Sequence, residues 1–110
     1  MRYLQLNIYA PSVKIYYAGI RPTDYPFENC GEFLCADNLH SKIYEVCKRT
    51  LVLSVHEHYE DCPWREQALY AMDSRNQMLC GYYAFAEYDM PKASIRLMSE
   101  SLREDGILEL

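Results

Sequence analysis

The sequence lacks any long run of apolar residues and any local cluster of lysine and arginine. Residues 2–9 alternate between apolar and polar side chains, so we expect neither a signal peptide nor a membrane-spanning segment. A net charge of -5 and scattered basic residues disfavour binding to a phosphate backbone, which requires a broad cationic surface. We therefore expect no membrane partner and no nucleic-acid partner.

The sequence also lacks the cysteine pattern of a disulfide scaffold or a zinc site. Its five cysteines are an odd set without dense spacing, so we expect free, mostly buried thiols and a reducing, cytoplasmic compartment. Possible metal ligands gather in one segment: His56, His58, Asp61 and Cys62. No CxxC or HExxH occurs there, and loop histidines with hydrogen bonds to the backbone are the better interpretation. We expect no metal and no cofactor.

The N-terminal third carries a strand pattern. Residues 2–9 place Leu4, Leu6 and Ile8 on one face, and residues 13–17 alternate again after a short turn, which predicts a β-hairpin. An isolated hairpin is marginally stable at best, so the pattern indicates strands that belong to a larger sheet. The expected boundary lies near residue 36, with strands and an irregular connector in residues 1–36.

The remainder, residues 37–110, has helical periodicity. Asp37 suits the N-cap of a long helix, because apolar residues recur at three-to-four-residue spacing after it: Leu39, Ile43, Val46, Cys47, Leu51 and Val55. Pro63 suits the first turn of a second helix that runs through about Phe85. Asp89 and Gly106 suit the N-cap and C-cap of a third helix. The predicted fold class is mainly α with an N-terminal β-hairpin.

Acidic residues cluster between His58 and Arg75, and bulky apolar residues separate them. Glu66 and Asp73 are seven positions apart, so on one helix they would share a face at roughly 10 Å. Asp61 could reach the same space from the preceding loop. Acids arranged in this way, with the donor fork of an arginine between them, suit recognition of a polyol.

Two interpretations of this cluster remain open from the residues alone. Glycoside hydrolysis needs a protonated carboxyl group and a second group that acts as base or nucleophile, and Glu66 is the candidate acid beside Trp64 and Tyr70. Alternatively, Asp61 and Glu66 only cap and charge a helix N-terminus, where acids favourably meet the helix dipole.

The segment DCPWREQALYAMD, residues 61–73, resembles a segment of the glycoside hydrolase family 78 α-L-rhamnosidases, in which DCPQR and an acid are followed by a further Asp. Trp64 stands where that family commonly has Gln, and Tyr70 replaces an expected Trp. The resemblance implies that Glu66 is the general acid. It also implies four substrate-binding residues: Asp61, Arg65, Tyr70 and Asp73.

The same resemblance implies an architecture and a substrate. Residues 37–110 would be the first helices of an (α/α)6 six-hairpin barrel, and residues 1–36 would be the end of a preceding β-sandwich. Enzymes of that family hydrolyse with inversion of the anomeric configuration and use a Glu of a later hairpin as general base. We therefore expect a fragment that acts on rhamnosides only as part of a longer enzyme. The alternative is a non-catalytic sugar-binding or structural remnant that self-associates as a homo-oligomer through exposed helix faces.

Overall fold

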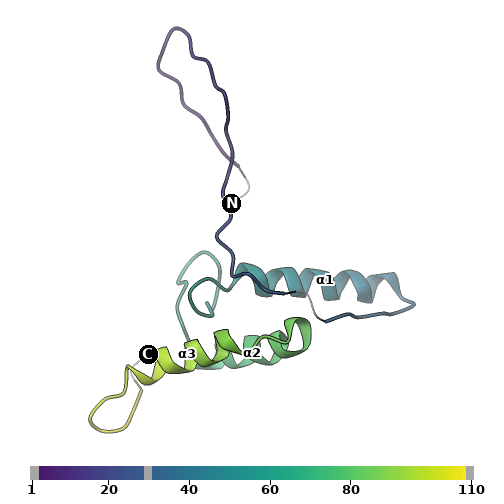
Figure 1. Cartoon of the computed structure of the whole chain (residues 1–110), viewed down its shortest axis with the longest axis vertical. Helices are drawn as coiled ribbons and strands as arrows, with labels where there is room; N and C mark the ends of the chain where they lie inside the picture. The colour runs from purple at the N-terminus through teal and green to yellow at the C-terminus, as the bar shows by residue number, and fades with distance from the viewer. Residues whose placement is uncertain (1–2, 29–30, 109–110) are drawn as a thin grey trace.

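Three helices form the ordered framework of the chain. The computed structural model describes residues 3–28 and 31–108, and the helices in this part are α1 (Asn38–Leu53), α2 (Ala71–Phe85) and α3 (Asp89–Ser99). The radius of gyration of 18.9 Å exceeds the roughly 13 Å of a compact domain of this length. The excess arises because the N-terminal segment projects far from the helices (Figure 1). None of the described helices is both long and apolar enough to cross a membrane.

The N-cap predicted for α1 is confirmed. The Asp37 carboxylate accepts a hydrogen bond of 2.8 Å from the backbone N–H of Leu39, which satisfies one of the free N–H groups of the first turn. The predicted apolar stripe of α1 is buried only in its C-terminal half. Its C-terminal members Leu51 and Val55 are buried, whereas the members in the first half of the helix are exposed: Leu39, Ile43 and Val46.

A small core lies where the end of α1 meets α2 and the start of α3. Its buried apolar residues are Leu51, Val55, Tyr59, Met78, Ala84, Phe85 and Met90. The connector before α1 adds to it, because the ring of Phe27 stacks on Phe85 with centroids 4.4 Å apart. The hydroxyl of Tyr25 donates to the Glu87 carboxylate at 3.1 Å. Residues 25–27 therefore pack onto the helices, unlike the segment before them.

The predicted N-terminal β-hairpin is not confirmed. Residues 3–28 contain no strand, and no backbone hydrogen bond joins residues 3–9 to residues 13–17. Leu4, Leu6 and Ile8 remain about half exposed. The physical reason is that two strands without a partner layer have no surface against which to bury one face. The described chain is mainly helical, and isolated bridges (Val55 to Tyr59 and Leu102 to Leu108) are its β-type pairings.

The second helix begins later than predicted. Residues 63–66 form a turn, Tyr70 is the N-cap, and α2 starts at Ala71 instead of Pro63. Gln67 has a φ of 52°, a left-handed conformation that cannot continue a right-handed helix. Residues 61–70 are therefore a loop that leads into α2.

Both predicted caps of the third helix are wrong. The Glu87 carboxylate, not that of Asp89, accepts from the first N–H groups of α3, at 2.7 Å from Asp89 N and 2.9 Å from Met90 N. The helix ends at Ser99, so Gly106 is not its C-cap. Gly106 has a φ of 80° and lies in the turn that follows Leu102, where glycine adopts this conformation at no steric cost.

Candidate functional site

The acidic segment folds into a closed loop, here named the acid loop, between Asp61 and Ala68. The backbone N–H of Asp61 donates to the carbonyl of Ala68 at 3.0 Å, and the N–H of Ala68 donates to the Asp61 carboxylate at 2.9 Å. The left-handed Gln67 turns the chain back so that these two residues meet. A side-chain carboxylate that binds nearby backbone N–H groups competes with helix formation, so the loop replaces the predicted first turns of the helix.

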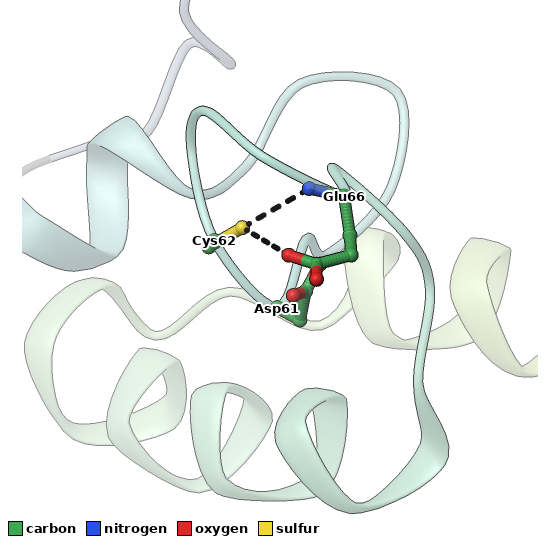
Figure 2. Close-up of side chains that lie close together, drawn as sticks. All are labelled: Asp61, Cys62 and Glu66. Carbon is green, nitrogen blue, oxygen red and sulfur yellow. Dashed lines mark hydrogen bonds between the residues drawn. The ribbon is translucent and has the colours of Figure 1, made fainter.

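Cys62 and Glu66 make a second pair of contacts inside the acid loop (Figure 2). The Cys62 thiol donates to Oε2 of Glu66 at 3.1 Å, and the backbone N–H of Glu66 donates to the Cys62 sulfur at 3.4 Å. Nε of Arg65 lies 3.4 Å from the other carboxylate oxygen, Oε1. One oxygen of Asp61, the sulfur and one oxygen of Glu66 all lie within 4.8 Å of one another. The loop thus gathers two carboxyl groups and a thiol.

The electrostatic state of Asp61 follows from these contacts. The N–H of Ala68 donates to the carboxylate and lowers the pKa of Asp61 below its ordinary value of 3.8. Partial desolvation opposes this effect, and hydrogen bonds from Cys62 and Glu66 add smaller contributions that lower the pKa further. Asp61 is therefore a stable anion at neutral pH, which suits a group that accepts hydrogen bonds from a ligand.

Buried residues anchor the start of the acid loop to the helices. The backbone N–H of Glu60 donates to the carbonyl of Ser54 at 2.9 Å, and the side-chain amide of Gln77 in α2 donates to the carbonyl of Glu60 at 2.6 Å. Tyr59 has no exposed surface, and burial raises the pKa of its hydroxyl, with Glu87 as a smaller cause. The residues that precede the acid loop, Tyr59 and Glu60, are therefore held in place by the core.

The structure brings together three of the five predicted site residues. Asp61, Arg65 and Glu66 lie in the acid loop, whereas Tyr70 and Asp73 lie at the start of α2 and share no hydrogen bond with them in the described chain. The prediction that Glu66 and Asp73 share a helix face is wrong, because Glu66 precedes the helix. Capping also fails as an account of Asp61 and Glu66. It fits only Asp73, an acid in the first turn of α2.

Cys62 is the residue of this site that sequence reasoning missed. The spacing could have indicated it, because Cys62 and Glu66 are four positions apart, and residues at this spacing are in contact across one turn of a helix or a helix-like turn. The predicted free thiols are confirmed for Cys35, Cys47, Cys62 and Cys80, but the predicted burial is wrong for three of them, which are exposed. Cys30 lies outside the described residues.

Asp61, Cys62 and Glu66 form a group that could offer three ligand atoms to a metal ion. A structural zinc site takes four ligands, and the thiol is already engaged with Glu66. The nearby histidines have other partners. Nδ1 of His58 bonds to the backbone carbonyl of Tyr59 at 2.8 Å, and Nδ1 of His56 bonds to the Glu60 carboxylate at 2.8 Å. We assign no ion to this group.

Comparison with known proteins identifies the family to which the chain belongs. The family described as bacterial α-L-rhamnosidase 6 hairpin glycosidase domain matches residues 28–110. The chain belongs to this family of glycosidases, and the resemblance predicted from residues 61–73 is confirmed. No solved structure matches it.

One curated protein matches part of the chain. The α-L-rhamnosidase of Formosa agariphila is 38% identical over 63 residues, which are 57% of this chain and 6% of that relative. The chain therefore corresponds to a small part of the length of the relative.

Proposed function

We propose that the acid loop and the start of α2 form the sugar-binding and proton-donating half of an inverting α-L-rhamnosidase site. The observation that carries the proposal is the gathering of Asp61, Arg65 and Glu66 in one closed loop. Membership of a glycosidase family supports a carbohydrate substrate. The printed name of the Formosa agariphila relative supports rhamnosides in particular.

The residues divide into binding and donating roles. Asp61 stays ionised because of the Ala68 N–H, so it accepts hydrogen bonds from sugar hydroxyls. Arg65, which is 87% exposed, can donate to the same sugar with its planar fork, and Tyr70 and Asp73 would contribute from the N-cap and first turn of α2. That leaves Glu66, 40% exposed, as the general acid that protonates the leaving oxygen.

Asp61 does not suit the role of general base. Inverting glycosidases separate acid and base by roughly 6.5–9.5 Å to leave room for a water molecule. Oxygens of Asp61 and Glu66 lie within 4.8 Å, and both belong to the same short loop, so they cannot flank a sugar ring from opposite sides. We propose that the base is a Glu supplied from outside residues 1–110, as the family resemblance implies, and that the 110-residue chain alone does not turn over substrate.

Sugar binding is tested with the 110-residue chain by NMR titration with L-rhamnose. We expect saturable shifts for the amides of the acid loop and the start of α2, and their loss in Asp61→Asn and Asp73→Ala. Glu104→Gln, an exposed acid beyond α3, is the matched control and should bind like the parent. Absence of saturable shifts in the parent chain would contradict the proposal.

Catalysis is tested in two assays. The purified chain should release no rhamnose from an aryl α-L-rhamnoside, and release abolished by Glu66→Gln would contradict the assignment of the base to another segment. In the second assay, residues 28–110, which match the glycosidase family, replace their counterpart in the Formosa agariphila enzyme. There Glu66→Gln should lower kcat by about 10²–10⁴ for a poor leaving group, and far less for an activated aryl group that needs no protonation.

A second candidate, a non-catalytic protein that self-associates, has one observation in its favour. Leu39, Ile43 and Val46 are exposed, and a largely apolar groove of about 450 Å³ lies between α1 and α2. Sedimentation equilibrium of the chain tests it, since a monomer at all concentrations would contradict it. Self-association and the cytoplasmic location both stay predictions.

A further inference from the structure

We infer that Cys62 is a positioning residue for the proposed general acid. Its thiol holds the Glu66 carboxyl group in one place and one orientation within the acid loop. The inference rests on the proposed function, because it gives Cys62 a role only through the proton-donor role of Glu66. Cys62 itself contacts no substrate in this account.

Two contacts of opposite direction join the residues. The thiol donates to Oε2 of Glu66 at 3.1 Å and its sulfur accepts from the Glu66 backbone N–H at 3.4 Å. The first contact fixes the carboxyl group and the second fixes the backbone that carries it. With Arg65 at Oε1, each carboxyl oxygen has its own neighbour, so rotation of the carboxyl group is restrained. A thiol is a weak donor, which allows it to orient the carboxyl group while leaving the proton free to move.

A purely structural role for Cys62 is disfavoured by what closes the loop. Asp61 and Ala68 close it with two hydrogen bonds that do not involve the thiol. Cys62 is also not among the buried core residues, so its side chain contributes little to the stability of the fold. Loss of the thiol should therefore release Glu66 while the loop stays closed.

A nucleophilic role for the thiol is disfavoured as well. The thiolate is the reactive form of cysteine, whereas the thiol of Cys62 donates its hydrogen to Glu66. The carboxyl groups of Asp61 and Glu66 both approach the sulfur within 4.8 Å. The hydrogen bond to Oε2 of Glu66 already engages the thiol, which suits positioning of that carboxyl group and not attack on a substrate.

The first experiment measures the S–H stretching band of the 110-residue chain by infrared spectroscopy. The difference between the parent and Cys62→Ser isolates the band of Cys62. We expect this band to move to higher frequency in Glu66→Gln, because an amide oxygen is a weaker acceptor than a carboxylate. Glu104→Gln should leave it unchanged. A band that does not move in Glu66→Gln would overturn the inference.

The second experiment measures amide hydrogen exchange by NMR. In Cys62→Ala the amide of Glu66 should exchange about fivefold faster, because its acceptor is lost. In Cys62→Ser it should stay protected, since a hydroxyl can accept and donate in the same way. The amide of Ala68, which reports loop closure, should be unaffected in both variants. Equal acceleration at Ala68 in Cys62→Ala would mean a structural role and overturn the inference.

Failure of the inference and failure of the proposed function are distinguishable. The leaving-group assay of Glu66→Gln tests the proposed function and does not involve Cys62. If the loss in that assay does not depend on the leaving group, Glu66 is not the proton donor and the inference falls with it. If the assay succeeds but the S–H band is unchanged in Glu66→Gln, only the positioning role of Cys62 is overturned.

Discussion

The side-chain amide of Gln77 donates a 2.6 Å hydrogen bond to the backbone carbonyl of Glu60, the residue that precedes the acid loop. The two residues are seventeen positions apart, so this bond ties the loop to the middle of α2. Glu60 is buried, so water has little access to its carbonyl as a substitute donor. Together with the bond from the Glu60 N–H to Ser54, this side chain therefore helps to fix the start of the acid loop relative to α2.

Gln77→Ala should destabilise the chain. Removal of the donor leaves the Glu60 carbonyl unsatisfied, so we expect the free energy of unfolding to fall by about 1–2 kcal/mol, measured by urea denaturation. Asn76→Ala, an exposed neighbour on α2, is the control and should change it by less than about 0.5 kcal/mol. Equal effects of the two substitutions would show that the bond to Glu60 is not formed.

The stability of the chain should depend on the ionisation of Asp61. Its pKa is lowered in the folded chain, chiefly by the Ala68 N–H, so its contribution is present above the ordinary value of 3.8 and is lost as the pH falls through the folded value. Asp61→Asn should therefore be less stable than the parent at pH 7, and the difference should shrink below pH 3.8. Thermal melts across this range measure it. Asp24→Asn, an exposed acid of the connector, should show no such trend.

Two glycines should respond to alanine in opposite ways. Gly81 lies inside α2, and an added Cβ would meet only the Tyr59 hydroxyl at 3.5 Å, an ordinary contact. Gly81→Ala should raise the free energy of unfolding by about 0.5–1 kcal/mol through helix propensity. At Gly31 the Cβ would meet the carbonyl oxygen of Tyr83 at 2.2 Å, so Gly31→Ala should destabilise. Denaturation curves of both variants test the packing of residue 31 on α2.

The start of α3 provides a direct comparison of two neighbouring acids. Glu87 accepts from two backbone N–H groups of the first turn and from Tyr25, whereas Asp89 forms a surface ion pair with Lys92 at 3.0 Å. Glu87→Ala should cost about 1–2 kcal/mol of unfolding free energy, and Asp89→Ala at most about 0.5 kcal/mol. Chemical denaturation monitored by circular dichroism measures both. A larger effect at Asp89 would restore the cap predicted from the sequence.

The helices were predictable where a local signal agrees with the packing. Asp37 before a run of apolar residues at helical spacing identified the start of α1, and the chemistry of that cap is local. The N-terminal alternation was an equally clear pattern, but strands need partners that a local pattern does not supply. The third helix shows a subtler limit, because Asp89 and Glu87 are both acids near the boundary and only the backbone geometry decides which one caps.

The candidate site was predictable in its residue types and not in its shape. The sequence around Asp61 and Glu66 indicated carboxyl chemistry and the glycosidase family. It could not indicate that Gln67 adopts a left-handed conformation, because residues other than glycine seldom do so and nothing in the side chain marks it. That single dihedral angle ends the predicted helix and brings Ala68 back to Asp61.

The hydrogen bonds that shape the acid loop all join residues between Asp61 and Ala68. The conformation of the loop is therefore determined by contacts within one short stretch of sequence, residues 61–68. It does not depend on what packs against the exposed faces of the helices. A synthetic peptide of this stretch, grafted between two rigid ends at the spacing of Asp61 and Ala68, would carry the arrangement of both carboxyl groups with it. The acid loop is thus the part of the candidate site with a local geometry, whereas the position of Asp73 depends on α2.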